Sequence, residues 1–382
     1  MTRRHYVSLF LTLVLLPFAL FSSCEKLAPE RQAYVVCMGL DVEADGRVTL
    51  SVQIPENAQG EQQGAQGAKP SATKGYSLFS VTADSFSDCY HLLASVIPYP
   101  LHFGQLRLCV LGEEKAAQSD LEKLVRDLIK LPAVRRTMIL AVAKGKAQAL
   151  ISAQAPDFGM RLSKHIDMTF QSLKMLGLSP ATTLADCVRW LGGGRADPLL
   201  TLCAVNQKLQ KQNEQNQGGG GDGGDSPEGG NAAAFAVARE PISYDESAQG
   251  MGELLPDDVR SGEMERKGEN PVEMFGAVVL SGVRVAGTLS VRETQVYSIA
   301  RGEGRLRVLR AGERLRLQLI LPGEHAALVP EAEALLRKLQ ALGSDAFGFG
   351  AAAATGFSTL GEWERYDFVK RYPMAEVDVA TE

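Results

Sequence analysis

The order of apolar and polar positions divides the chain into four regions. Residues 7–21 are almost continuously apolar. Residues 24–205 and 271–382 contain short segments with the period of strands or of helices, whereas residues 206–270 are rich in Gly, Gln, Asn, Asp and Glu and have almost no sustained apolar period. This pattern predicts two folded parts separated by a disordered linker.

Alternation with a period of two, together with short apolar runs, predicts the strands of the first folded part. The strand-like segments are residues 34–40, 48–54, 76–81, 106–112 and 137–143. Between the first two lies DVEADGR, in which Asp41, Glu43 and Asp45 have the spacing of a calcium-binding loop. Position 12 of such a loop is a glutamate, and here it is Val52, so Asp45-Gly46 predicts a hairpin turn instead.

Apolar residues three and four positions apart predict the helices of the same part. The helix-like segments are residues 84–96, 120–131, 147–154, 161–176 and 183–191. The apolar stripe of the second one consists of Leu121, Leu124, Val125, Leu128 and Ile129. Ser119 stands before this helix and is its predicted N-cap. Because strands and helices alternate, we expect a mixed α/β layer structure here.

The second folded part also mixes strands with helices. Two apolar runs flank Ser281-Gly282, which predicts a tight hairpin. Residues 314–320 alternate as a strand, residues 331–343 have the period of a helix, and residues 374–380 form a last strand-like run. The predicted fold class is therefore α+β, with mixed β-sheets and packed helices in two or three domains.

The N-terminal apolar run has the length of a signal peptide and not of a membrane span. Its roughly fifteen residues would extend about 22 Å as a helix, whereas the bilayer core is about 30 Å thick. Arg3 and Arg4 precede the run, and the small residues Ser22 and Ser23 stand directly before Cys24. The pattern resembles a bacterial lipobox, in which the cysteine is acylated and becomes the new N-terminus. Ordinary secretory cleavage and an uncleaved anchor are the alternatives.

Composition and charge argue against a nucleic-acid partner. The formal net charge is −5, and no basic cluster with interleaved aromatic residues occurs in the chain outside its N-terminal end. The six cysteines are dispersed, without CxxC pairs or zinc spacing. Cys37 and Cys109 stand inside apolar strand-like runs, which predicts buried thiols.

The sequence gives no reason to favour an enzyme. His91, His102, His165 and His325 are isolated from any partner motif, and GxSxG, HExxH, Walker A and CxxCH motifs do not occur. We therefore predict no catalytic residue, no metal site and no cofactor. The acidic residues are expected on solvated faces of the molecule.

The order of these segments resembles the C-subunit lipoproteins of spore germinant receptors, the Ger(x)C family. The segments that carry the resemblance are VVCMGLDVEADGRVTLSVQIP, PLHFGQLRLCVLGEEKA, LVRDLIKLPAVRRTMILAVAKGKAQALI, MFGAVVLSGVRVAGTLSVRETQVYSIARGEG and SDAFGFG. The resemblance implies a lipoprotein signal peptide over residues 1–23, an N-terminal germination-protein domain over 24–205, a linker or insertion over 206–270 and a C-terminal germination-protein domain over 271–382.

Several functional expectations follow from this resemblance. It implies a non-enzymatic subunit that is anchored through acyl chains on Cys24 and assembles with two integral membrane partners, an A-type and a B-type subunit. The place would be the outer face of the spore inner membrane, and the process would be nutrient-triggered germination. The alternative reading is a solute-binding lipoprotein of a membrane transporter, which would have two similar α/β lobes around a cleft.

Overall fold

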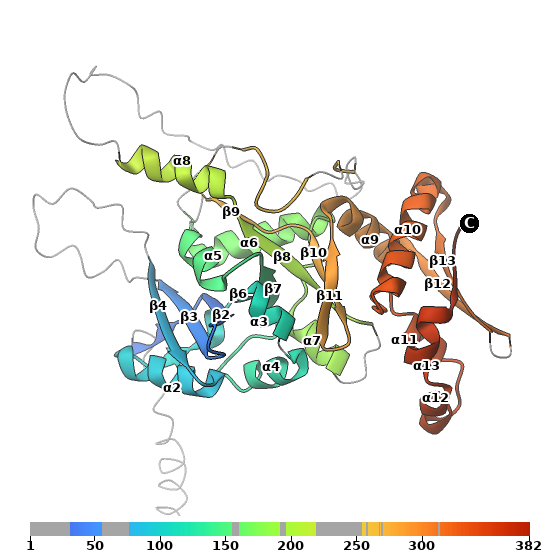
Figure 1. Cartoon of the computed structure of the whole chain (residues 1–382), viewed down its shortest axis with the longest axis horizontal. Helices are drawn as coiled ribbons and strands as arrows, with labels where there is room; N and C mark the ends of the chain where they lie inside the picture. Colours follow the sequence, from blue (N-terminus) through green and yellow to red (C-terminus); the bar gives the residue numbers. More distant parts are fainter. Residues whose placement is uncertain are drawn as a thin grey trace, which may run out of the picture.

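The computed structural model of the chain shows two main β-sheets of unequal size, each packed against helices, and a small two-stranded sheet (Figure 1). It describes residues 31–55, 76–118, 120–154, 160–191, 196–218, 254–256, 259–266, 268, 270–311 and 314–382. The predicted α+β fold class is confirmed, because mixed sheets and helices make up both parts.

The first sheet has nine strands, eight of them in the order β11-β10-β8-β7-β6-β2-β3-β4, with β9 paired to β8. Their bounds are β2 Cys37–Val42, β3 Val48–Pro55, β4 Tyr76–Ala83, β6 Leu108–Leu111, β7 Ile139–Ala143, β8 Leu199–Val205, β9 Val272–Glu273, β10 Ala277–Ser281 and β11 Arg284–Leu289. The central strands β2, β6, β7 and β8 run parallel to one another. They therefore begin at a common edge of the sheet, which we call the amino edge.

Helices cover both faces of this sheet. Helices α2 (Phe86–Val96), α4 (Leu121–Leu128) and α7 (Leu184–Leu191) bury apolar side chains in one core cluster, to which the short helix α3 (Glu113–Gln118) contributes Ala116. Helices α5 (Ala147–Ala153) and α6 (Leu162–Met175) contribute to a separate cluster on the opposite face. The parallel strands are apolar on both faces because both are covered.

Two short strands lie at the amino edge. Strand β1 (Ala33–Tyr34) pairs in parallel with β5 (Leu101–His102), and a 3₁₀ turn, η2 (Phe103–Gln105), follows. The Phe103 N–H donates to the carbonyl of Pro132 in the connection between α4 and β7. The segments before β2, β6 and β7 are thus held together at this edge.

The sheet joins residues from both sides of the predicted linker. Strands β9, β10 and β11 follow residue 270, yet β9 and β10 pair with β8. At the start of the predicted linker, residues 207–218 form helix α8 (Gln207–Gly218). Ser261 is buried beside β9. The domain boundaries themselves stay a prediction.

The second sheet has three strands and belongs to the C-terminal part. Strand β13 (Arg314–Leu321) pairs antiparallel with β12 (Arg305–Ala311) and parallel with β14 (Glu376–Thr381). Helices α9 (Val291–Glu303) and α10 (Val329–Ala341) share its core cluster. The remaining helical segments are η3 Gly323–Leu328, α11 Phe349–Ala354, α12 Leu360–Tyr366, α13 Phe368–Arg371 and η4 Tyr372–Met374.

The structure corrects two local predictions and confirms others. Asp120, and not Ser119, is the N-cap of α4: its carboxylate accepts from the N–H groups of Glu122 and Lys123. Ile129 is 43% exposed because α4 ends at Leu128, while the rest of the predicted stripe is buried. The hairpins at Asp45-Gly46 and Ser281-Gly282 form as predicted.

Candidate functional site

Cys24, the predicted lipidation site, lies outside the described residues, which begin at Arg31. Among the helices that the structure describes, none is long and apolar enough to cross a membrane. The five described cysteines are buried free thiols, as predicted for Cys37 and Cys109. Burial raises the pKa of the Cys109 thiol to about 12, so the thiol stays protonated and is no nucleophile.

The Gly-Leu-Asp segment at the end of β2 has a structural role that its sequence did not reveal. The two carboxylate oxygens of Asp41 accept from the backbone N–H groups of Ala147 and Gln148, at 2.7 and 2.9 Å. Asp41 is buried, and these contacts satisfy the first N–H groups of α5. Gly39 lets α5 approach, since a Cβ there would lie 2.6 Å from Ile151 Cδ1.

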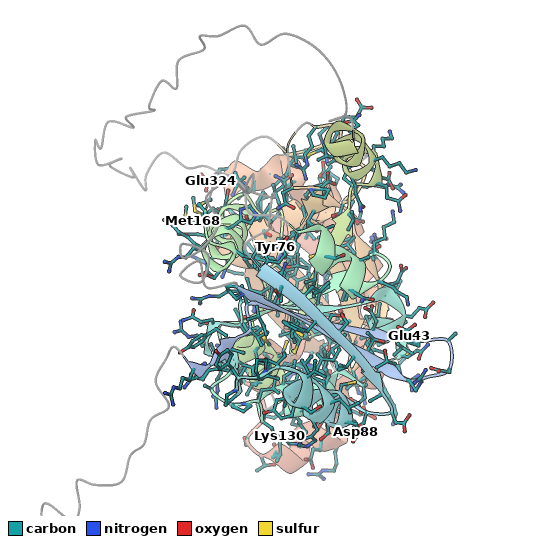
Figure 2. The ribbon with its side chains drawn as sticks, turned by 90° about the vertical axis from the view of Figure 1, so that its left-hand side faces the viewer. Glu43, Tyr76, Asp88, Lys130, Met168 and Glu324 are labelled. Carbon is teal, nitrogen blue, oxygen red and sulfur yellow. The ribbon has the colours of Figure 1, made fainter. Side chains whose placement is uncertain are left out.

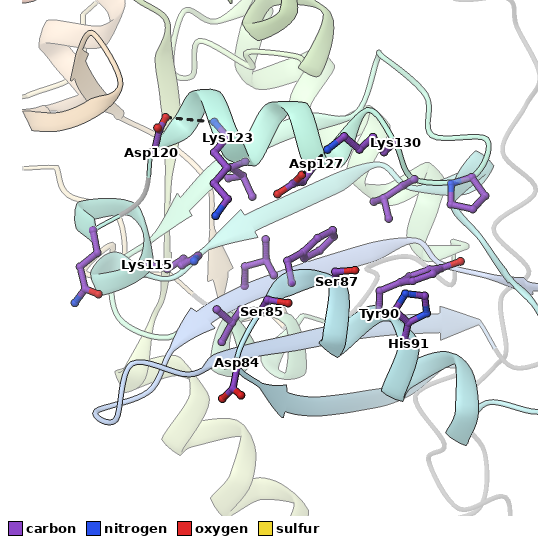
Figure 3. Close-up of a pocket in the computed structure, with 17 residues that line it drawn as sticks. Asp84, Ser85, Ser87, Tyr90, His91, Lys115, Asp120, Lys123, Asp127 and Lys130 are labelled. Atoms are coloured by element: carbon purple, nitrogen blue, oxygen red, sulfur yellow. Dashed lines mark hydrogen bonds and ion pairs between the residues drawn. The ribbon is translucent and has the colours of Figure 1, made fainter.

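A groove of about 840 Å³ runs between α2 and α4 on the opposite face of the sheet (Figure 3). Its floor is apolar, with Leu40, Val48 and Leu124 among the lining side chains. Asp84 and Lys115 lie toward one end, and Tyr90, His91 and Lys130 lie toward the other (Figure 3). The second end opens at Pro132, which belongs to the amino edge.

Charged groups of both signs line this groove. Burial lowers the pKa of Lys115, and the positive charge of Lys123 lowers it further. Lys130 is paired with Asp127 at 3.0 Å. The Asp120 carboxylate caps α4 and accepts from the backbone N–H of Lys123, which Figure 3 shows as a dashed line. An apolar floor beneath two neighbouring ammonium groups suits non-covalent binding of a partly apolar acidic group.

Ser85, one of the two serines that line the groove, serves the local fold. Ser85 Oγ is the N-cap of α2: it accepts from the Asp88 N–H and donates to the Asp88 carboxylate at 2.6 Å. This hydroxyl is therefore committed to the start of a helix. The described part of the groove supports binding, and it offers no nucleophile activated by a base.

Two histidines find partners that sequence spacing did not indicate. His165 is buried and its Nε2 lies 3.1 Å from Asn270 Nδ2. His325 Nε2 lies 2.7 Å from a carboxylate oxygen of Glu303, and Glu324 is close to both. Both acidic side chains of this trio are exposed, and a surface ion pair accounts for the arrangement.

Asp197 and Asp345 connect the first sheet with the C-terminal part. Asp197 accepts from the N–H of Gly282 in the β10–β11 turn and from the N–H of Asp345. Asp345 in turn accepts from three N–H groups of the following segment, ending at Gly350. Burial raises the pKa of both carboxyls, that of Asp345 to about 7. The SDAFGFG segment is therefore a buried joint.

Comparison with known proteins identifies the family. Residues 27–205 match the family model described as the spore germination protein N-terminal domain. Residues 27–205 therefore belong to the family of spore germination protein N-terminal domains. The predicted resemblance to the C subunits of germinant receptors is confirmed by this match.

Two further comparisons accompany the family match. No curated protein matches the sequence of this chain. A solved structure described as the crystal structure of the GerBC protein is similar over 90% of this chain and 95% of that chain, at 10% sequence identity and a TM-score of 0.44.

Proposed function

We propose that this Ger(x)C protein is the lipid-anchored, non-enzymatic C subunit of a spore germinant receptor, needed for nutrient-triggered germination. The observation that carries the proposal is the match of residues 27–205 to the spore germination protein N-terminal domain, which begins three residues after Cys24. Diacylation and N-acylation of Cys24 would provide the two anchoring signals that stable membrane attachment requires.

The anchored subunit assembles with two integral membrane subunits, an A-type and a B-type, at the outer face of the spore inner membrane. Anchoring restricts the protein to the membrane plane, which raises its effective concentration beside such partners. The groove between α2 and α4 is consistent with a binding role, since its lining combines apolar and charged side chains.

The alternative of a transporter's solute-binding lipoprotein is less well supported. That class would present two similar α/β lobes around a cleft. The described residues of this chain instead form a nine-stranded sheet and a three-stranded sheet of different topology.

The anchor is tested by replacing Cys24 with Ala and fractionating the cells. We expect the variant to leave the membrane fraction, or to keep its signal peptide, and to lose the mobility shift of acylation. A matched control is Cys187→Ala, since Cys187 is a buried free thiol. Unchanged mobility and membrane attachment of Cys24→Ala would refute lipidation.

Assembly is tested by purifying the tagged full chain from detergent-solubilised spore membranes and identifying the proteins that accompany it. We expect an A-type and a B-type membrane subunit. Recovery of an ATPase and a permease in their place would favour the solute-binding alternative and contradict the receptor proposal.

A further inference from the structure

The amino edge of the first sheet exposes apolar side chains that the fold does not bury. Val96 ends α2 and is 63% exposed, Tyr99 follows it and is 49% exposed, and Ile129 follows α4 and is 43% exposed. Helices α2 and α4 return from the opposite edge of the sheet, so both end here. Figure 1 shows the two helices along the same side of the molecule.

Positive charge also gathers at this edge, where Asp127 and Asp167 are already paired with Lys130 and Arg107. Arg31, Arg135 and Arg136 are exposed, and no salt bridge joins any of them to another described residue. The three segments that meet here, residues 31–36, 97–107 and 129–138, contain no Asp or Glu. This surface is therefore cationic as well as apolar, although the whole chain has a net charge of −5.

Backbone hydrogen bonds hold these segments in one surface. The Ala33 N–H donates to the Pro100 carbonyl at 3.0 Å, one residue after Tyr99. The Phe103 N–H donates to the Pro132 carbonyl at 3.3 Å, between Ile129 and Arg135 in the sequence. We call the six side chains the amino-edge surface: Arg31, Val96, Tyr99, Ile129, Arg135 and Arg136.

The chain length between this surface and Cys24 limits its distance from the membrane. Six residues lie between Cys24 and Arg31, and the seven Cα–Cα steps that join them span about 25 Å at most in a fully extended chain. Acyl chains on Cys24 would therefore keep Arg31 and the amino edge beside it within about 25 Å of the lipid headgroups. Apolar and aromatic side chains flanked by arginines are the composition that favours an anionic membrane interface.

We propose that the amino-edge surface rests on an anionic lipid bilayer, with Val96, Tyr99 and Ile129 at the headgroup level and the three arginines facing lipid phosphates. The inference rests on the proposed lipid anchor and adds an orientation to it: the groove mouth at Lys130 and Pro132 faces the membrane, while the β2–β3 turn at Asp45 faces away. Figure 2 shows Lys130 and Glu43, which precedes that turn, at separate places on the molecule.

The orientation is tested with nitroxide labels on the full acylated chain in vesicles of phosphatidylcholine and phosphatidylglycerol. One label is attached at Val96→Cys, and its matched control at Asp45→Cys, an exposed position on the opposite edge. The five described native thiols are buried, and the chain without a new cysteine measures any background labelling. Accessibility to oxygen and to a water-soluble nickel complex is then measured for each label.

We expect reconstitution to shield the Val96 label from nickel several-fold and to leave the Asp45 label unchanged. Arg135→Glu combined with Arg136→Glu should abolish that shielding, and so should removal of phosphatidylglycerol. If the vesicles retain the protein while both labels stay equally open to nickel, the anchor stands and the orientation is wrong. If the vesicles do not retain the protein, the anchor itself has failed.

A protein partner at the same surface is a separate outcome of this experiment. In that case the Val96 label would stay exposed in protein-free vesicles and become immobilised only when the A-type or B-type subunit is added. That result would overturn the proposal of a lipid-facing surface.

Discussion

Asp197 and Asp345 are joined by two hydrogen bonds, which connect the first sheet with the C-terminal part. The Asp345 N–H donates to the Asp197 carboxylate at 2.9 Å, and the Asp197 N–H donates to the Asp345 carbonyl at 3.1 Å. Asp197 also accepts from Gly282 in the β10–β11 turn. Two residues 148 positions apart thereby fix the strands of one sheet relative to the helices beside the other.

Because Asp345 is buried, this joint makes stability depend on pH. Burial is the main cause that raises the Asp345 pKa to about 7, and the charge of Asp197 raises it further. Hydrogen bonds from three backbone N–H groups lower the pKa but do not cancel these effects. The native state then binds a proton that the unfolded chain releases near pH 4, so the contribution of Asp345 to the unfolding free energy falls as pH rises from about 4 to 7. The full loss is up to about 4 kcal/mol.

The measurement is urea unfolding of the wild type and of Asp345→Asn at pH 5 and pH 7.5. Asparagine cannot ionise, and its oxygen still accepts from Gly348 and Phe349 in the native geometry. We expect the stability difference, variant minus wild type, to become more positive at pH 7.5 than at pH 5. A difference that is constant with pH would show that Asp345 does not titrate in this range.

Gly39 is predicted to be required for the packing of α5 on β2. In Gly39→Ala the new Cβ would lie 2.6 Å from Ile151 Cδ1, and we expect a loss of about 1–3 kcal/mol in the free energy of unfolding. Ile151→Val removes that methyl group, so the double variant should recover part of the loss. Gly302→Ala is the control, because a Cβ at this helical position meets open space. An equal loss in Gly302→Ala would point to a general effect of alanine.

Asp41 is predicted to stabilise the first turn of α5. Asp41→Ala leaves the N–H groups of Ala147 and Gln148 without their acceptors, which costs about 1–2 kcal/mol. Hydrogen exchange should show the lost protection at these two amides. Asp41→Asn keeps one acceptor oxygen and should have an intermediate effect. Unchanged exchange in Asp41→Ala would contradict the capping role.

Counting reactive thiols tests two predictions in one experiment: the burial of the described cysteines and the acylation of Cys24. The five described cysteines are buried, so N-ethylmaleimide should leave the native protein unmodified. In guanidinium chloride we expect five adducts on the membrane-bound form by mass spectrometry, since Cys24 would be blocked by its thioether. Six adducts would show a free Cys24 thiol and contradict acylation. Labelling without denaturant would contradict the burial.

Much of the local structure could be predicted because it depends on nearest neighbours in the chain. The alternation of apolar and polar residues predicted strands β3 and β13, and an apolar stripe predicted helices α4 and α10. Turn residues identified the hairpins at Gly46 and Gly282, where φ is positive. The low-complexity composition of residues 206–270 hid helix α8, because a helix without an apolar stripe gives no periodic signal.

The amino-acid sequence by itself determined the positions of many strands and helices, the lipobox-like Cys24 and the family that the order of segments resembles. Only the tertiary structure decided that β10 and β11 complete the first sheet, that Asp41 caps α5, and that the segments at Phe103 and Pro132 meet at one edge. The physical reason is range: a strand or helix is specified by residues two to four positions apart, whereas these relationships join segments that only the packed sheet brings together.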